Sequence, residues 1–218
     1  AAGDKVRMLL DLPGSSDELL AGLKAKVRSQ VKKPLKDGLT ATTGGAELLD
    51  DFYKVFAENM RDLGSPVHSR GWIESIVRFY KGRALVGVVF TPEGEPAAAG
   101  ILLTHPVTVS IPWASSLRRF NRLNPNMLLY WTFLAHAADH GFKRFDFGRS
   151  TMDEGTYRFK KQWGARPAPL VWQEVLARSS GTSNPQPGKG AGRRLAEALW
   201  LRLPLPVCNL LGPKLRRY

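Results

Sequence analysis

Asp146, Gly148 and Arg149 stand together at what the sequence predicts to be the end of a strand. A guanidinium directly after a glycine can hold a phosphate or carboxylate with its planar fork, and a following helix N-terminus would add backbone donors. This place in a strand-to-helix turn favours anion binding by Arg149, although an ion pair at a sheet edge is the alternative. Asp146 could orient an amine or act as a base, and pairing with Arg144 or Arg149 explains it nearly as well.

The serine and histidine residues give weaker signals. Ser150 suits a helix cap better than a nucleophile, because no hydrolase dyad is spaced around it, and we assign it with Arg149 to substrate binding. His136 and His140 share one helix face, but solvation near a helix end is the commoner explanation for such a pair. The chain has one cysteine, Cys208, so we predict neither a metal site nor an intramolecular disulfide.

The elements that must position these residues follow from capping signals and hydrophobic periodicity. A capping box begins at Ser15, and Pro34 is expected to stop the helix that follows. A proline after Asn124 marks another helix start, and a second capping box at Thr151 opens a short helix. We expect helices at 15–33, 47–63, 71–80, 125–140 and 151–163, and strands at 83–90, 97–105, 107–116, 142–148 and 170–177. This alternation predicts an α/β fold with a mixed β-sheet flanked by helices.

Charge and hydropathy indicate the kind of partner. The 218 residues include 32 Lys or Arg and 19 Asp or Glu, a formal charge of +13. This surplus favours anionic partners such as RNA, phosphorylated precursors or an acidic membrane face. No apolar run reaches the roughly 18 to 20 residues that span a bilayer, and no signal-peptide pattern opens the chain. We therefore expect a cytoplasmic location, with peripheral contact at the inner face of the plasma membrane as an option.

Composition also predicts how the chain is divided. Residues rich in Ser, Gly, Pro and Asn read as a linker, and a basic, leucine-rich amphipathic tail follows them. The start at Ala1, without a methionine, favours a piece cut from a longer protein. The expected parts are a leader or interdomain segment at 1–14, a main domain at 15–178, a flexible linker at 179–192 and a basic apolar C-terminal arm at 193–218.

Three segments resemble the FemAB/FemX family of N-acyltransferases, closest to its relatives in bacterial exopolysaccharide and protein-sorting clusters. They are Pro125–Trp131, Gly141–Ser150 and Tyr157–Ala165. The resemblance covers about Ser15 to Ala177, and its most specific part runs from Phe145 to Gly164. It implies a GNAT-like fold and aminoacyl transfer to an amine of a cell-envelope or exopolysaccharide precursor. Since family members carry two tandem GNAT-like halves, it also implies that this chain is the second half. In the family the first half holds part of the acceptor site, which leaves an inactive isolated second half as an alternative.

The resemblance also suggests roles for side chains. Lys160 matches the Phe-Lys pair of the family motif, where a cation would neutralise charge on the transferred carbonyl or bind a tRNA terminus. Tyr157 would donate a proton to the leaving group, with half-buried packing as the equal alternative. With Asp146, these two residues form the expected catalytic set. Arg118 and Arg119 follow the 107–116 strand and are assigned to substrate binding.

The acyl donor is the last expectation. Acetyl-CoA enzymes of this superfamily carry a glycine-containing loop that cradles pyrophosphate, whereas 117–123 has cations and no glycine. We therefore expect no bound cofactor and a donor such as aminoacyl-tRNA, with acetyl-CoA less favoured. Two alternatives remain: a non-catalytic anion-binding module for tRNA or membranes, and an acetyl-CoA-dependent N-acetyltransferase.

Overall fold

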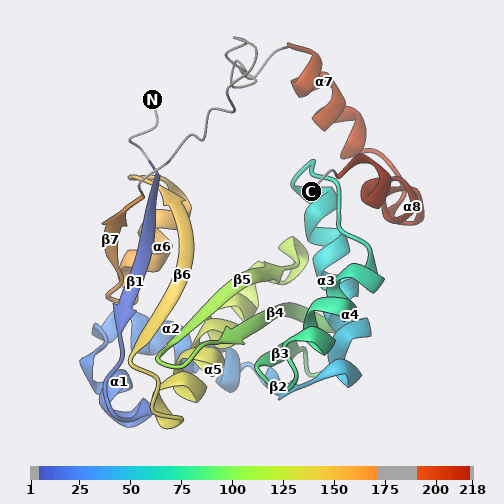
Figure 1. Ribbon diagram of the computed structural model, residues 1–218. Coiled ribbons are helices and arrows are strands. Elements are labelled where there is room, and N and C mark those ends of the chain that lie inside the picture. Colours follow the sequence, from blue (N-terminus) through green and yellow to red (C-terminus); the bar gives the residue numbers. More distant parts are fainter. Residues whose placement is uncertain (1–4, 171–190, 217–218) are drawn as a thin grey trace.

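The fold is a seven-stranded sheet with helices on both faces, and a computed structural model describes residues 5–170 and 191–216 of it (Figure 1). The strands are β1 (Lys5–Asp11), β2 (Thr40–Gly44), β3 (Ala84–Phe90), β4 (Pro96–Thr104), β5 (Thr108–Ser116), β6 (Arg144–Thr151) and β7 (Arg166–Pro169). Their order across the sheet is β2-β3-β4-β5-β6-β1-β7. Only the β5–β6 pair is parallel among these strands, so the expected mixed sheet is confirmed.

Two groups of helices bury the two faces of this sheet. The α-helices are α1 (Ser16–Gly22), α2 (Ala25–Lys36), α3 (Leu49–Asp62), α4 (Arg70–Phe79), α5 (Pro125–Asp139), α6 (Gly155–Gln162), α7 (Ala191–Trp200) and α8 (Leu205–Leu215). Short 3-10 helices, η1 (Ala46–Leu48) and η2 (Arg118–Leu123), precede α3 and α5. One apolar cluster joins α1, α2, α5 and α6 to the sheet, and a second cluster joins α3 and α4 to its other face.

Helix α5 reaches unusually close to the sheet at two opposed glycines. Gly87 of β3 pairs with Gly100 of β4, and the Phe133 ring of α5 lies over both. A Cβ atom at Gly87 would lie 2.6 Å from the Phe133 ring, and one at Gly100 would lie 2.9 Å from it. Glycine is therefore required at both positions for the aromatic ring to fit, and Phe133 itself is fully buried.

The N-terminal region differs from the expectation in two ways. Residues 1–14 were expected to lie outside the domain, but Lys5–Asp11 forms β1 within the sheet, between β6 and β7. The Ser15 side chain does accept a hydrogen bond from the Glu18 backbone N–H, which confirms the cap. The predicted single helix is instead split into α1 and α2. Pro34 does not stop α2, which continues to Lys36 with Pro34 buried.

Three further expectations were wrong in detail. β6 continues through Arg149 and Ser150, so neither residue lies in a strand-to-helix turn. The N-cap of α6 is Glu154 and its side chain makes no capping bond, so the second capping box does not form. β2 and β7 were not predicted, because Thr40–Gly44 and Arg166–Pro169 lack an apolar pattern.

Two predicted segments cannot be compared with the structure. Residues 171–177 of the expected last strand and 179–190 of the expected linker lie outside the described residues, and Leu170 itself is in no strand.

Candidate active site

The sheet divides in two between β5 and β6, and the predicted site residues of β6 and α6 lie beside this division. Only Thr108–Ser110 pairs with Arg144–Asp146. Beyond that point β5 stays with β4 while β6 stays with β1, so the two strands diverge (Figure 1). Backbone N–H and C=O groups along the facing edges have no strand partner there, and they can hold an extended ligand by main-chain hydrogen bonds.

Lys160 extends from α6 to the backbone of β6 beside this divergence. Its Nζ donates a 2.8 Å hydrogen bond to the carbonyl oxygen of Arg149, and the residue is only 8% exposed. Burial lowers the pKa of the Lys160 amine from 10.5 to about 8, although the negative charge of Asp146 acts in the opposite direction. An amine with a pKa near 8 can supply positive charge and can also exchange a proton close to neutral pH.

Asp146 is held by a partner that the sequence did not suggest. The Arg7 Nε donates to its Oδ2 at 2.6 Å, and a second guanidinium nitrogen of Arg7 pairs with the same oxygen. The other oxygen accepts the Gly148 backbone N–H at 2.8 Å. Arg144 instead pairs with Asp11, so the alternative in which Arg144 pairs with Asp146 is wrong. Both oxygens of this buried carboxylate are already hydrogen-bonded. Asp146 therefore fits the role of a fixed negative charge that acts on Lys160 better than the role of a free base.

A bulge in β6 sets the orientation of the residues that follow Asp146. Phe147 and Gly148 together face Met8 of β1, and Gly148 has a φ of +76°, which favours glycine. After the bulge, Ser150 pairs with Val6 and is buried, whereas Arg149 is exposed on the opposite face. Arg149 and Ser150 therefore do not point in the same direction, although they are neighbours.

Buried polar atoms on β6 and α6 lack partners within the described part of the chain. The Ser150 hydroxyl and the Trp163 indole N–H are both enclosed and make no hydrogen bond. Since Ser150 lies inside a strand, the helix-cap role expected for it is wrong. Tyr157 of α6 is also buried in the core, and the Lys161 ammonium lies 5.6 Å from its ring centroid. Ser150, Tyr157 and Lys160 thus lie where α6 packs on β6, whereas Asp146 lies on the other face of β6, beside Arg7.

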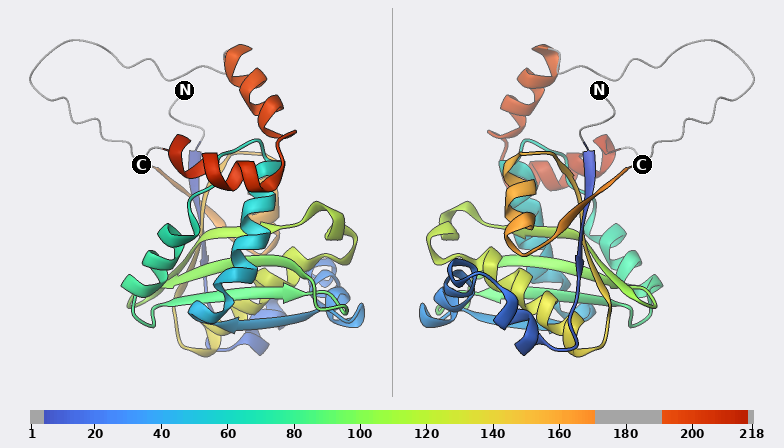
Figure 2. Two further views of the ribbon diagram at one scale, coloured as in Figure 1. Left: turned by 90° about the vertical axis from the view of Figure 1, so that its right-hand side faces the viewer. Right: turned by 90° about the vertical axis from the view of Figure 1, so that its left-hand side faces the viewer.

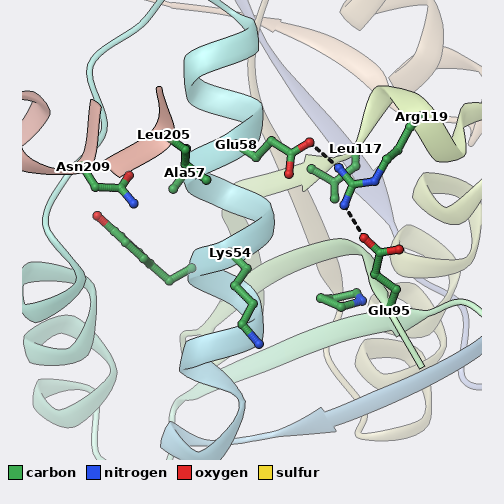
Figure 3. A pocket seen from close by; sticks show the side chains of 10 residues that line it. Lys54, Ala57, Glu58, Glu95, Leu117, Arg119, Leu205 and Asn209 are labelled. Carbon is green, nitrogen blue, oxygen red and sulfur yellow. Dashed lines mark hydrogen bonds and ion pairs between the residues drawn. The ribbon is translucent and has the colours of Figure 1, made fainter. Parts of the chain in front are cut away.

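Arg118 and Arg119 lie elsewhere, on η2 against α3. Arg118 donates to the Asp62 carbonyl oxygen at 2.8 Å. Arg119 forms ion pairs with Glu58 and Glu95 in a pocket of about 390 Å³ (Figure 3). The residues around this pocket come from α3, α8, η2 and the start of β4, and they include no residue of β6 or α6. The two arginines are therefore not part of the Lys160 region.

The histidines show a local interaction. The rings of His136 on α5 and of His140 directly after α5 stack with centroids 3.9 Å apart, and burial lowers the pKa of His136. No group of three or more possible metal-binding side chains is found in residues 5–170 and 191–216.

Arg7 is the site residue that sequence reasoning missed. The alternation of Val6, Met8 and Leu10 as apolar residues is a strand signal, and it places Arg7 on the opposite face. Because residues 1–14 were assigned to a leader or interdomain segment, this strand was not predicted.

Residues 22–161 match the family model described as an acetyltransferase (GNAT) domain, which is more than half of the chain. The chain belongs to the GNAT acetyltransferase family. The matched part of this GNAT domain runs from the end of α1 into α6 and includes Asp146, Arg149 and Lys160. The predicted acyltransferase class is thereby confirmed at the level of the family.

Solved structures share the fold of this GNAT domain at low sequence identity. FemX is 18% identical with a TM-score of 0.68, over 75% of this chain and 59% of the FemX chain. L-PGS from Bacillus licheniformis is 14% identical with a TM-score of 0.59, over 99% of this chain and 66% of that one. A tandem GNAT protein from the clavulanic acid biosynthesis pathway is 14% identical with a TM-score of 0.52, over 76% of this chain and 50% of that one.

These comparisons confirm the expected FemAB-like GNAT fold, and this chain spans 59% of the length of FemX. No match was found among curated proteins. Within the part of the chain that the structure describes, no helix is long and apolar enough to cross a membrane.

Proposed function

We propose that this GNAT domain catalyses FemAB-like N-acyl transfer, with an aminoacyl-tRNA as donor and an amine of a cell-envelope or exopolysaccharide precursor as acceptor. The amine nitrogen attacks the aminoacyl carbonyl carbon, an amide bond forms, and the ester bond to the tRNA ribose breaks. The proton lost by the amine ends on the ribose hydroxyl that leaves. The proposal also includes a GNAT-like half that precedes this domain in the full protein.

The buried amine of Lys160, beside the divergence of β5 and β6, is the observation that carries this proposal. Negative charge develops on the carbonyl oxygen during attack, and a positioned cation in a site of low polarity stabilises that charge strongly. The Arg149 carbonyl holds the amine in place, and Asp146 favours its charged form. The lowered pKa also suits Lys160 to pass a proton to the leaving oxygen.

Two observations support tRNA over acetyl-CoA as the source of the acyl group. The η2 segment after β5 has cations but no glycine, and Arg118 and Arg119 are already bonded to Asp62, Glu58 and Glu95. Helix α2 carries a groove lined by Arg28, Lys32, Lys33 and Lys36, with Asp37 as its only acid, and such a surface suits a polyanion.

A second candidate, a non-catalytic anion-binding module, rests on that same α2 groove and the +13 charge. It predicts tRNA binding without transfer. Acetyl-CoA-dependent acetylation is the third candidate, and a rise in melting temperature on addition of CoA would favour it.

The test is transfer of a labelled amino acid from charged tRNA to nucleotide-linked and lipid-linked peptide precursors. We expect Lys160→Ala to lower kcat by roughly 10²-fold or more, the range for loss of one group that stabilises an oxyanion. Lys161→Ala is the matched control, because Lys161 is the next residue on α6 and is exposed. Equal rates for the wild type and Lys160→Ala would remove Lys160 from the mechanism. Binding of tRNA with no transfer by any form would favour the non-catalytic module.

A further inference from the structure

The C-terminal helices concentrate apolar side chains on their outer surface. Here α7, α8 and the residues between them are called the α7–α8 arm. Ten large hydrophobic side chains are exposed in the described part of the chain, and five of them belong to this short segment: Leu199, Leu201, Leu210, Leu211 and Leu215. Leu210 is 65% exposed. A cluster of this kind marks an interaction surface more often than chance exposure does.

The inner side of the α7–α8 arm is attached to the domain. Its outer side therefore keeps a fixed orientation relative to the domain. Cys208 is buried, and a Cβ at Gly212 would lie 2.8 Å from the Val67 backbone nitrogen. The guanidinium of Arg216 donates to the Pro66 carbonyl oxygen at 2.8 Å. α8 lies across the end of α3 while α7 extends away from it (Figure 2). Leu210, Leu211 and Leu215 are therefore presented by a docked helix, α8.

Basic residues outnumber acidic ones in this segment. Glu197 of α7 is its one acid, and it lies against Gly64 of the domain. From Ala198 to Tyr218 the sequence contains no Asp or Glu and four cationic residues: Arg202, Lys214, Arg216 and Arg217. Lys214 is exposed and lies on α8 between Leu211 and Leu215. Exposed leucines next to an excess of basic residues form the kind of surface that binds at the interface of an anionic bilayer.

We propose that the outer face of the α7–α8 arm docks on an anionic phospholipid surface. The leucines would enter the boundary between head groups and acyl chains, and the basic side chains would stay among the phosphates. The arm lies at the same end of the molecule as the start of β1 and the end of β6 (Figures 1 and 2). Docking would bring this end of the domain, towards which β5 and β6 diverge, close to the lipid.

The charges argue against a second copy of the chain as the occupant. In a two-fold dimer built on this face, the same surface meets itself, so Lys214 and Arg202 would face cations, because the one acid of the arm, Glu197, lies against Gly64. An anionic lipid surface satisfies both the leucines and the cations. The docking does not require the acyl transfer proposed above, and each can fail without the other.

The test is sedimentation of the protein with vesicles of phosphatidylcholine alone or mixed with phosphatidylglycerol. We expect binding to the mixed vesicles and little to the neutral ones. Leu210→Ser with Leu215→Ser should lower partitioning into mixed vesicles at least tenfold. Lys214→Glu should lower it by about fivefold or more, because each basic residue near the surface contributes roughly that factor.

The control is Phe79→Ser, which removes a more exposed apolar side chain, 76% exposed on α4, outside the arm. It should leave vesicle binding unchanged, and melting curves should show that every variant is folded. Equal binding of the leucine variant and the wild type would overturn the proposal, as would equal binding to neutral vesicles. A dimer that the leucine substitutions dissociate, without vesicle binding by the wild type, would assign the face to a second copy instead. Loss of transfer with intact vesicle binding would count only against the proposed chemistry.

Discussion

Replacing Lys160 by methionine should make the GNAT domain more stable near neutral pH. Methionine keeps a long, flexible side chain of similar volume but carries no charge to bury. In the wild type, burial opposes the charged amine and lowers its pKa from 10.5 to about 8. The substitution removes this unfavourable burial and loses one hydrogen bond to the Arg149 carbonyl, so the net gain is smaller than the burial term.

The magnitude follows from proton linkage. Since the folded pKa lies below the unfolded one, the unfolded chain binds more protons between about pH 8 and 10.5, and the stability of the wild type rises with pH in that window. The full difference between the unfolded and folded pKa of Lys160 corresponds to about 3 kcal/mol of stability. Solvent screening of the amine reduces this to about 2 kcal/mol. The penalty is fully present below pH 8 and disappears above pH 10.5.

Urea unfolding of the wild type and Lys160→Met at pH 7 and pH 10 measures this difference. The other titrating groups are the same in both proteins, so their effect cancels when the free energy of unfolding of Lys160→Met is subtracted from that of the wild type. We expect this difference to rise in favour of the wild type by about 2 kcal/mol from pH 7 to pH 10. Lys161→Met, on the exposed side of α6, should show no such shift. A Lys160→Met difference that is the same at both pH values would refute the assignment of a lowered pKa to Lys160.

Two further predictions concern stability, measured by the same unfolding assay. Arg7→Met leaves the buried Asp146 carboxylate without its cation and should lower the free energy of unfolding by about 2 to 3 kcal/mol. Arg144→Met, which breaks an exposed pair, should lower it by less than about 1 kcal/mol, and similar losses in both variants would contradict the role given to Arg7. Gly100→Ala places a Cβ 2.9 Å from both the Phe133 ring and the Trp113 carbonyl oxygen, and it should destabilise the domain by about 1 to 3 kcal/mol. Unchanged stability would contradict this close packing.

Local signals in the sequence predicted most helices and the hairpin correctly. The Ser15 cap forms, and the helix predicted after Asn124 is α5. Asn124 itself makes no side-chain capping bond and has a φ of +54°, so the start depends on Pro125 rather than on the cap. The end of β6 was placed too early because Gly148 resembles a turn residue. It instead allows a bulge that only pairing with β1 reveals.

The candidate site was predicted in part. The sequence selected Asp146, Tyr157 and Lys160, which do lie on the neighbouring elements β6 and α6, but it also included Arg118 and Arg119, which lie against α3. Adjacency in the chain does not determine which partners a long cationic side chain meets, because η2 turns away from β6 after β5 ends.

By itself, the sequence determined the α/β class, the family and the residue types available for acyl transfer, because periodicity, caps and motifs are local properties of the chain. Only the tertiary structure decided that Lys160 is buried with a lowered pKa and that β5 and β6 diverge beside it. It also gave Asp146 its partner, since Arg7 is 139 positions away in the chain. Burial, electrostatic pairing and strand order depend on contacts between distant segments, and no local pattern encodes them.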